Sequence, residues 1–259
     1  MNVSKSQVST LAVKVDSLLN EWRERPLTEK YKYLIVDARY EKVRDNGHIM
    51  SKAAVVAVGI TAKGTREVIG TWVVNSESYE AWDSCIAGLK DRGLQNIEYV
   101  VSDENKGLRK ALMKHFQGAL LQRCQVHFMR NFIGKLSKKD HAEAIKLLQD
   151  VFAADAKDEA MRRLQGVIAH LMNKKKVDVA SWLEDSIEET LMVLELPAAH
   201  RKQMKSTNML ERVNQELKRR TRVVRIFPNE QSCLRMLTAL CQEISEDWGD
   251  RRYLNMNDL

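Results

Sequence analysis

Long apolar segments are absent from the 259-residue sequence. The longest near-continuous apolar run covers residues 53–58, whereas a membrane-spanning helix needs about 20 apolar residues. Residues 1–20 contain no apolar block followed by small residues, which is the pattern of a secretory signal. We therefore expect neither a membrane protein nor a secreted one.

Cysteine and proline are also scarce. Four cysteines do not make the dense disulfide framework of a small secreted protein, so we expect a reduced, cytoplasmic chain. Only 3 prolines and 11 glycines accompany 44% hydrophobic and 30% charged residues, which excludes a fibrous or wholly disordered protein.

Glycine is nearly missing from the second half of the chain, since nine of the eleven lie at or before Gly134. We therefore expect tight turns in the first half and helices in the second. Short segments rich in Val and Ile predict strands at residues 33–36, 53–60, 68–74 and 97–101. Apolar residues at helical spacing predict helices at residues 78–89 and 108–116. This order predicts an α/β fold, a mixed sheet with helical cover.

Residues 136–196 have helical periodicity throughout, and helices are also expected at residues 206–219 and 231–247. The prolines Pro26, Pro197 and Pro228 lie at the joints of this scheme, because proline disfavours helix in the residue before it. The N-terminal segment predicts a helix capped by Ser4. Two interpretations of this helix stay open, a linker and the recognition helix of a helix-turn-helix motif.

The excess positive charge is concentrated in one segment of the chain. The net charge is +7, and residues 201–225 alone hold nine Lys or Arg against two acids, so that the remainder is neutral. A local basic segment of this kind favours a polyanionic partner, and nucleic acid is the commonest one.

Three carboxylates are candidates for chemistry. Asp37 and Asp103 each follow an apolar strand segment, and acids at strand ends converge at one rim of an open sheet. Glu211 lies on the polar face of the helix expected at residues 206–219, inside the basic segment. The alternatives are that the aspartates cap turns, and that Glu211 pairs at the surface with Arg212 or Gln215.

Three carboxylates would repel a polyanion such as nucleic acid, and a bound divalent metal ion would remove that repulsion. Mg²⁺ prefers oxygen ligands, and two ions about 4 Å apart serve phosphoryl transfer in many enzymes. Cys124 and His127 form a C-x-x-H motif. A zinc site needs about four ligands, and neither Cys233 nor Cys241 has a partner at tight spacing, so a structural or substrate-adjacent role is favoured.

Five segments in this order resemble the IS256 family of bacterial transposases, which belongs to the Mutator-like group. The segments are residues 37–44, 102–108, 123–127, 206–212 and 219–229, and the resemblance extends over residues 3–250. It departs from the family at Asn105, where many members have histidine. Further N-terminal helix-turn-helix sequence is usual in the family, so we expect that this chain lacks most of that region and that the Ser4 helix is a remnant of it.

The resemblance implies a DDE transposase with an RNase H-like fold interrupted by an all-helical insertion. Asp37, Asp103 and Glu211 would be the catalytic, metal-binding triad, with two Mg²⁺ (or Mn²⁺) ions, and the C-x-x-H motif would lie close to Asp103. The domains would be residues 1–27, 28–135, 136–198 and 199–259. An aromatic residue of the insertion contacts DNA in the wider group; Trp182 is the candidate, with core packing as its alternative.

The predicted function is DNA cleavage and strand transfer at the ends of an insertion sequence. DNA, including terminal inverted repeats and target, would be the partner of at least a homodimer. The basic residues expected to hold phosphates are Arg212, Lys218, Arg219, Arg220, Arg222 and Arg225. Two alternatives stay open: a nuclease of RNase H type without strand transfer, and an inactive DNA-binding remnant.

Overall fold

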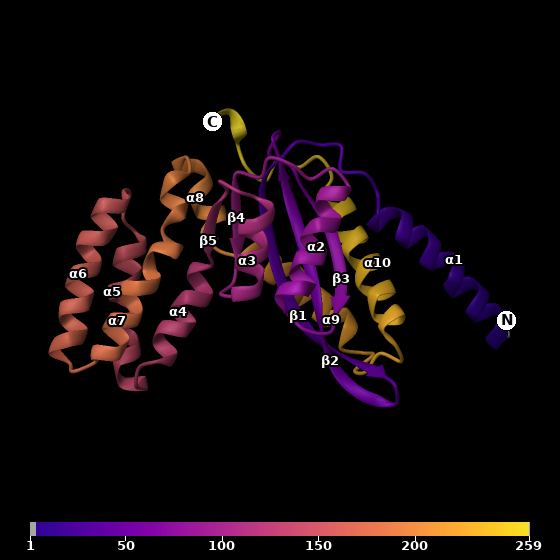
Figure 1. The fold of residues 1–259 in the computed structure, drawn as a ribbon, viewed down its shortest axis with the longest axis horizontal. Helices are drawn as coiled ribbons and strands as arrows, with labels where there is room; N and C mark the ends of the chain where they lie inside the picture. The colour runs from indigo at the N-terminus through magenta and orange to yellow at the C-terminus, as the bar shows by residue number, and fades with distance from the viewer. Residues whose placement is uncertain (1–3, 259) are drawn as a thin grey trace.

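One mixed sheet of five strands organises residues 4–258, the part of the chain that the computed structural model describes (Figure 1). β1 (Tyr31–Asp45), β2 (His48–Thr61) and β3 (Arg66–Val74) are consecutive and antiparallel. β4 (Tyr99–Ser102) pairs in parallel with β1, and β5 (Leu120–Arg123) pairs in parallel with β4. The strand order is β3-β2-β1-β4-β5, so β1 lies at the centre.

Both faces of the sheet are covered, which explains the uninterrupted apolar run in β2. Successive side chains of a strand point to opposite faces. Accordingly Ala54 and Val56 join one core cluster, while Val55 and Ala57 join a second cluster on the opposite face. All four of these side chains are buried. The sheet is therefore the middle layer of three.

Two pairs of helices form the outer layers. α2 (Tyr79–Asp91) and α3 (Lys106–His115) lie in front of the strands in Figure 1 and supply Trp82, Ile86 and Leu112 to the second cluster. α9 (Asn208–Thr221) and α10 (Glu230–Trp248) supply Leu210 and Leu237 to the first. Each helix thus buries one apolar face against the sheet.

The N-terminal helix α1 (Lys5–Arg23) extends away from the body of the molecule (Figure 1). Ser4 caps it in a reciprocal capping box with Gln7, as the sequence predicts. Asp16 ties α1 to α10 by an ion pair with Arg235 at 2.6 Å.

A group of helices follows β5 and lies to the left of the sheet in Figure 1. It contains α4 (Gln125–Gly134), α5 (His141–Phe152), α6 (Lys157–Asn173), α7 (Val177–Ser186) and α8 (Ala198–Met204). Short 3₁₀ turns occupy Lys138–Asp140, Ile187–Thr190 and Met192–Glu195, and another is at Met256–Asp258. α4 to α7 have a core of their own, built from side chains such as Phe128, Leu148, Leu164 and Leu183.

Trp182 belongs to that helical core. Its ring stacks on Phe128, with ring centroids 4.9 Å apart, and Lys135 lies 4.8 Å from its centroid. The contacts of Trp182 in the structure are therefore packing contacts within the helical core.

The sequence predicted most of these elements, but it missed β5, α4 and α8, and the strand expected at residues 33–36 is much longer in the structure. Asp37 does not end its strand, because β1 continues to Asp45 through its pairing with β2. The four cysteines are free and buried. Among the described residues, we find no helix long and apolar enough to cross a membrane.

Candidate active site

Asp37 and Asp103 are neighbours because of the register between two parallel strands. Ile35 of β1 lies opposite Val101 of β4, and each aspartate comes two residues later. Positions two apart in a strand share a face, so Asp37 lies on the face where Ile35 and Val101 join the first core cluster. β4 ends at Ser102, which leaves room for the Asp103 side chain beside the continuing strand β1.

Glu211 comes from α9, the helix that covers this same face. Leu210 and Val213 anchor the helix in the cluster that also holds Ile35. Asn214 lies three residues after Glu211, and its side-chain amide donates a hydrogen bond of 2.7 Å to Oδ2 of Asp37. The amide therefore fixes α9 against β1 at the level of the two aspartates.

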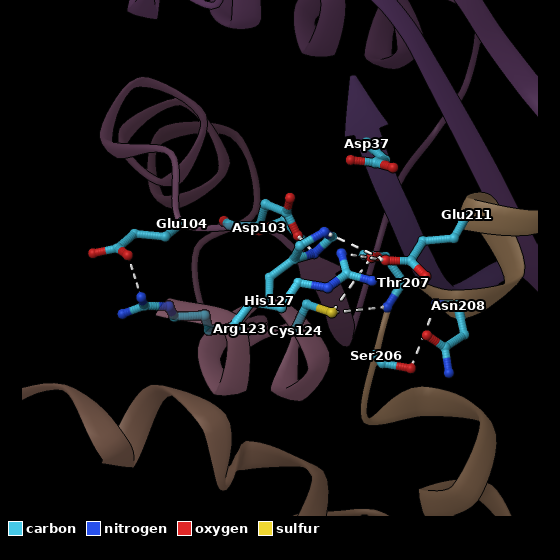
Figure 2. A network of polar contacts seen from close by, with 12 residues as sticks. Asp37, Asp103, Glu104, Arg123, Cys124, His127, Ser206, Thr207, Asn208 and Glu211 are labelled. Atoms are coloured by element: carbon cyan, nitrogen blue, oxygen red, sulfur yellow. Dashed lines mark hydrogen bonds and ion pairs between the residues drawn. The ribbon is translucent and has the colours of Figure 1, made fainter. Parts of the chain in front are cut away.

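His127 links the second and third carboxylates. Its Nδ1 contacts Oδ1 of Asp103, and its Nε2 lies 3.4 Å from Oε1 of Glu211. Figure 2 shows Asp103 and Glu211 on either side of the imidazole ring. Arg130, three residues further along α4, reaches the same glutamate oxygen at 3.2 Å. Glu211 thus pairs with these two residues, and not with Arg212 or Gln215, the alternative considered from the sequence.

The C-x-x-H motif lies at the junction of β5 and α4. Cys124 is the N-cap residue of α4, and its backbone N–H donates to the Ser102 carbonyl at 2.8 Å. Its buried Sγ accepts hydrogen bonds of 3.4 Å from both the backbone N–H and the hydroxyl of Thr207. The motif therefore connects the end of β4 with the segment that leads into α9.

The ligand atoms of Asp103, Cys124 and His127 lie within 4.8 Å of one another. A structural zinc site uses four protein ligands. This cluster, as found among the described residues, offers three. In this structure Cys124 contacts Thr207 and His127 contacts Asp103, so the contacts that the motif makes here are positioning contacts.

The pKa of Asp37 depends on its burial and on its charged neighbours. Burial, together with the charge of Asp103, raises the pKa of Asp37 to about 7, although His127, the Ala38 backbone and Asn214 all lower it. Only 8% of Asp37 is exposed. Two carboxylates in one dry space disfavour double ionisation.

The pKa of His127 is raised as well, which for an imidazole favours the charged form. Hydrogen bonds to Asp103 and Cys124 raise the pKa of His127 to about 10, against the effect of its partial burial. Burial alone would raise the pKa of Cys124, but hydrogen bonds from His127 and Thr207 lower it below the usual value. At neutral pH an imidazolium therefore supplies positive charge between Asp103 and Glu211.

These residues fit a divalent cation. Oxygen is the ligand that Mg²⁺ and Mn²⁺ prefer, and Asp37, Asp103 and Glu211 offer three carboxylates from three elements. Burial and the charge of Asp103 raise the pKa of Asp37, and a bound cation would offset both effects by favouring the ionised carboxylate.

The six basic residues expected to hold phosphates divide into groups. Lys218, Arg222 and Arg225 are exposed. Arg219 and Arg220 pair with Glu216 at 2.6 and 2.9 Å, and these pairs lower the pKa of Glu216 to about 2. Arg212 lies on another side of α9, away from the carboxylates. The basic segment is thus partly neutralised by its own acids.

Sequence reasoning missed Asn214, Arg130 and Thr207. The first two follow Glu211 and His127 by three residues, the spacing that puts side chains on one helix face. That spacing was a usable signal. Thr207 lies in the segment 206–212 that carries the family resemblance, but only the fold brings it to Cys124. Asn105, where the sequence departs from the family, caps α3 by accepting from the Leu108 N–H at 2.8 Å.

Comparison with known proteins agrees with the resemblance. Residues 1–251 match the family model described as "Transposase, Mutator family". The chain is 42% identical to the transposase for insertion sequence element ISRM5 of Rhizobium meliloti and 42% identical to that for IS406 of Burkholderia multivorans. It is 38% identical to the transposase for IS256 in transposon Tn4001 of Staphylococcus aureus. Each match covers 99% of this chain but only 64–66% of the relative, so the chain spans just under two thirds of their length. This chain belongs to the Mutator family of transposases.

Proposed function

We propose that this chain is the catalytic core of a transposase that cuts DNA at the ends of an insertion sequence and joins those ends to a target. The relatives are named as transposases for insertion sequence elements. The observation that carries the proposal is the meeting of Asp37, Asp103 and Glu211, three acids far apart in the sequence, around one imidazole.

The proposed fold type is RNase H-like, with the helical residues 136–198 as an insertion before the helix of the third acid. The strand order β3-β2-β1-β4-β5 supports it, since three antiparallel strands are followed by two parallel ones. The separate core of the helical group supports the insertion.

Asp37, Asp103 and Glu211 would hold two Mg²⁺ or Mn²⁺ ions. Bound ions supply charge that favours both the attacking and the leaving oxygen in phosphoryl transfer. The protein's own part is to orient these acids: Asn214 holds Asp37, and His127 and Arg130 hold Glu211. Lys218, Arg222 and Arg225 are free to contact DNA phosphates.

In the proposed reaction, water first attacks a phosphodiester at the element end and releases a 3′-hydroxyl. That hydroxyl then attacks a phosphodiester of the target. Bringing two ends together favours at least a dimer on DNA.

Nicking of supercoiled plasmid DNA with added Mg²⁺ tests the proposal. Asp37→Asn should abolish nicking while DNA binding survives, and Asp45→Asn, at the exposed end of the same strand, should nick normally. Retained nicking by Asp37→Asn contradicts the triad. A wild-type chain that binds DNA but never cuts it would be an inactive remnant.

A pre-cut DNA end with a free 3′-hydroxyl separates the transposase from a nuclease that only cuts. The transposase joins this end to a second DNA molecule, giving a longer product. Cutting without any joined product supports the nuclease.

A further inference from the structure

A second polar site lies on the other side of the helix that carries Glu211. Consecutive residues of an α-helix point about 100° apart, so Glu211 faces the carboxylates while Arg212 faces a different space. That space is a cavity of about 490 Å³, lined by Arg66, Lys202, Arg212, Trp248 and Tyr253 among others. We call it the α9 rear cavity.

Positive charge dominates this cavity. Arg66, Lys202 and Arg212 form no ion pair and no side-chain hydrogen bond within the described part of the chain. Glu216 also lines the cavity, but Arg219 and Arg220 occupy its carboxylate oxygens. The cavity thus holds cations that have no acid of their own.

The Arg66 guanidinium stacks on two aromatic rings of the cavity wall. Its guanidinium carbon lies 4.4 Å from the ring centroid of Trp248 and 4.5 Å from that of Tyr253. Burial lowers the pKa of Arg66, Tyr253 raises it, and the charges of Arg212 and Arg251 lower it. Stacking uses the faces of the guanidinium and leaves its in-plane N–H groups free to donate. An anion in the plane of this group would relieve the repulsion among the three arginines.

Flat aromatic side chains beside free cations suit a nucleotide. Phosphate oxygens accept from arginine in a bidentate manner, and an unpaired base stacks on the free face of an aromatic ring. The volume of about 490 Å³ falls in the usual range of small-molecule sites, about 300–1,000 Å³. A base inside a duplex cannot enter such a site, because its faces are already stacked.

We infer that the α9 rear cavity takes one unpaired nucleotide of the DNA strand whose scissile phosphate lies at Asp37, Asp103 and Glu211. The inference rests on the proposed function. A helix with its side chains is about 10 Å across, and a DNA strand rises about 3.4 Å per nucleotide. A strand crossing α9 would therefore bring a nucleotide about three positions from the cut into the cavity.

Fluorescence anisotropy in EDTA tests the cavity without cleavage. The probes are a fluorescein-labelled duplex with a single-stranded 3′ extension and the same duplex with blunt ends. The wild-type chain should bind the extended DNA more tightly by about fivefold or more, the effect of stacking one base. Arg66→Gln and Lys202→Gln should each lose most of that preference.

Lys110→Gln is the matched control, since the Lys110 ammonium lies 4.4 Å from the Tyr79 ring, outside the cavity. It should keep the preference. Lys202 is exposed, so its variant should fold even if Arg66→Gln is unstable. If the wild type binds both DNAs equally, or both cavity variants keep the preference, the cavity inference is wrong and the proposed function stands. If the wild type binds neither DNA, both are wrong.

Discussion

Replacing Asp37 by asparagine should stabilise the metal-free protein, and the gain should depend on pH. The pKa of this buried carboxyl is raised from 3.8 to about 7. About three pKa units at 1.36 kcal/mol each give roughly 4 kcal/mol as the cost of its ionisation in the fold. Since the folded state binds the proton more tightly, stability falls as the pH rises from about 4 to 7. Above pH 7 the whole cost is present, and below about pH 4 it vanishes.

Urea unfolding in EDTA at pH 8 and at pH 4 measures this effect. Asp37→Asn should raise the free energy of unfolding by up to about 4 kcal/mol at pH 8, because asparagine has no charge to desolvate yet still accepts from Asn214. At pH 4 the two proteins should be nearly equal. In Asp45→Asn the lost partner is Lys52, 2.8 Å away, but the buried ammonium of Lys52 keeps Glu230 at 2.6 Å. This control should lose about 1 kcal/mol or less at pH 8.

Two results would refute the reasoning. One is an Asp37→Asn variant that is less stable than the wild type at pH 8, which would mean that the ionised carboxylate stabilises the fold. The other is an equal gain at both pH values, which would trace the effect to packing and not to charge.

Other changes have expected outcomes of their own. Mg²⁺ affinity, measured by calorimetry, should weaken below pH 7 by up to about tenfold per pH unit, because Asp37 must release its proton; a flat profile would contradict the raised pKa. His127→Gln should lower the free energy of unfolding in EDTA at pH 7 by about 1–3 kcal/mol, since it removes the cation beside Asp103 and leaves Glu211 with Arg130 alone; an unchanged urea midpoint would exclude that role. Trp182→Ala should cost about 3 kcal/mol through lost stacking and leave DNA affinity unchanged; weaker binding by a fully folded variant would favour a DNA contact. Lys218→Gln should reduce the slope of log affinity against log salt by about 1, whereas Arg219→Gln, whose charge Glu216 already offsets, should change it less; equal slopes would mean that the ion pair opens on DNA.

The candidate acids could be found in the sequence because each follows a local pattern. Asp37 and Asp103 come after runs of buried apolar residues, and Glu211 lies on the polar flank of a periodic helix. Their positions after strand segments indicated that Asp37 and Asp103 share one rim of the sheet, although the parallel register of β1 with β4 that makes them neighbours could not be predicted. In the sequence, only the family resemblance joined Glu211 to them.

The missed strand has a physical reason as well. β5 is four residues long, and its last two residues are Gln122 and Arg123. Both polar side chains are buried, where Gln122 donates to the Thr190 carbonyl at 2.8 Å. Such a strand is stabilised by its neighbours and has little apolar content of its own, so periodicity does not reveal it.

The backbone contact between the two ends of the helical group has a consequence for how this enzyme family can vary. The N–H of Gln125 donates to the Lys205 carbonyl at 3.0 Å, and Cys124 and Thr207 meet directly beside it. The chain therefore leaves the sheet for the helical group and returns to the sheet at the same place. The entropic cost of closing a loop grows only slowly with its length. Residues beyond α4 could accordingly be added or removed, and new surfaces built there, without changing the distance between Asp103 and Glu211.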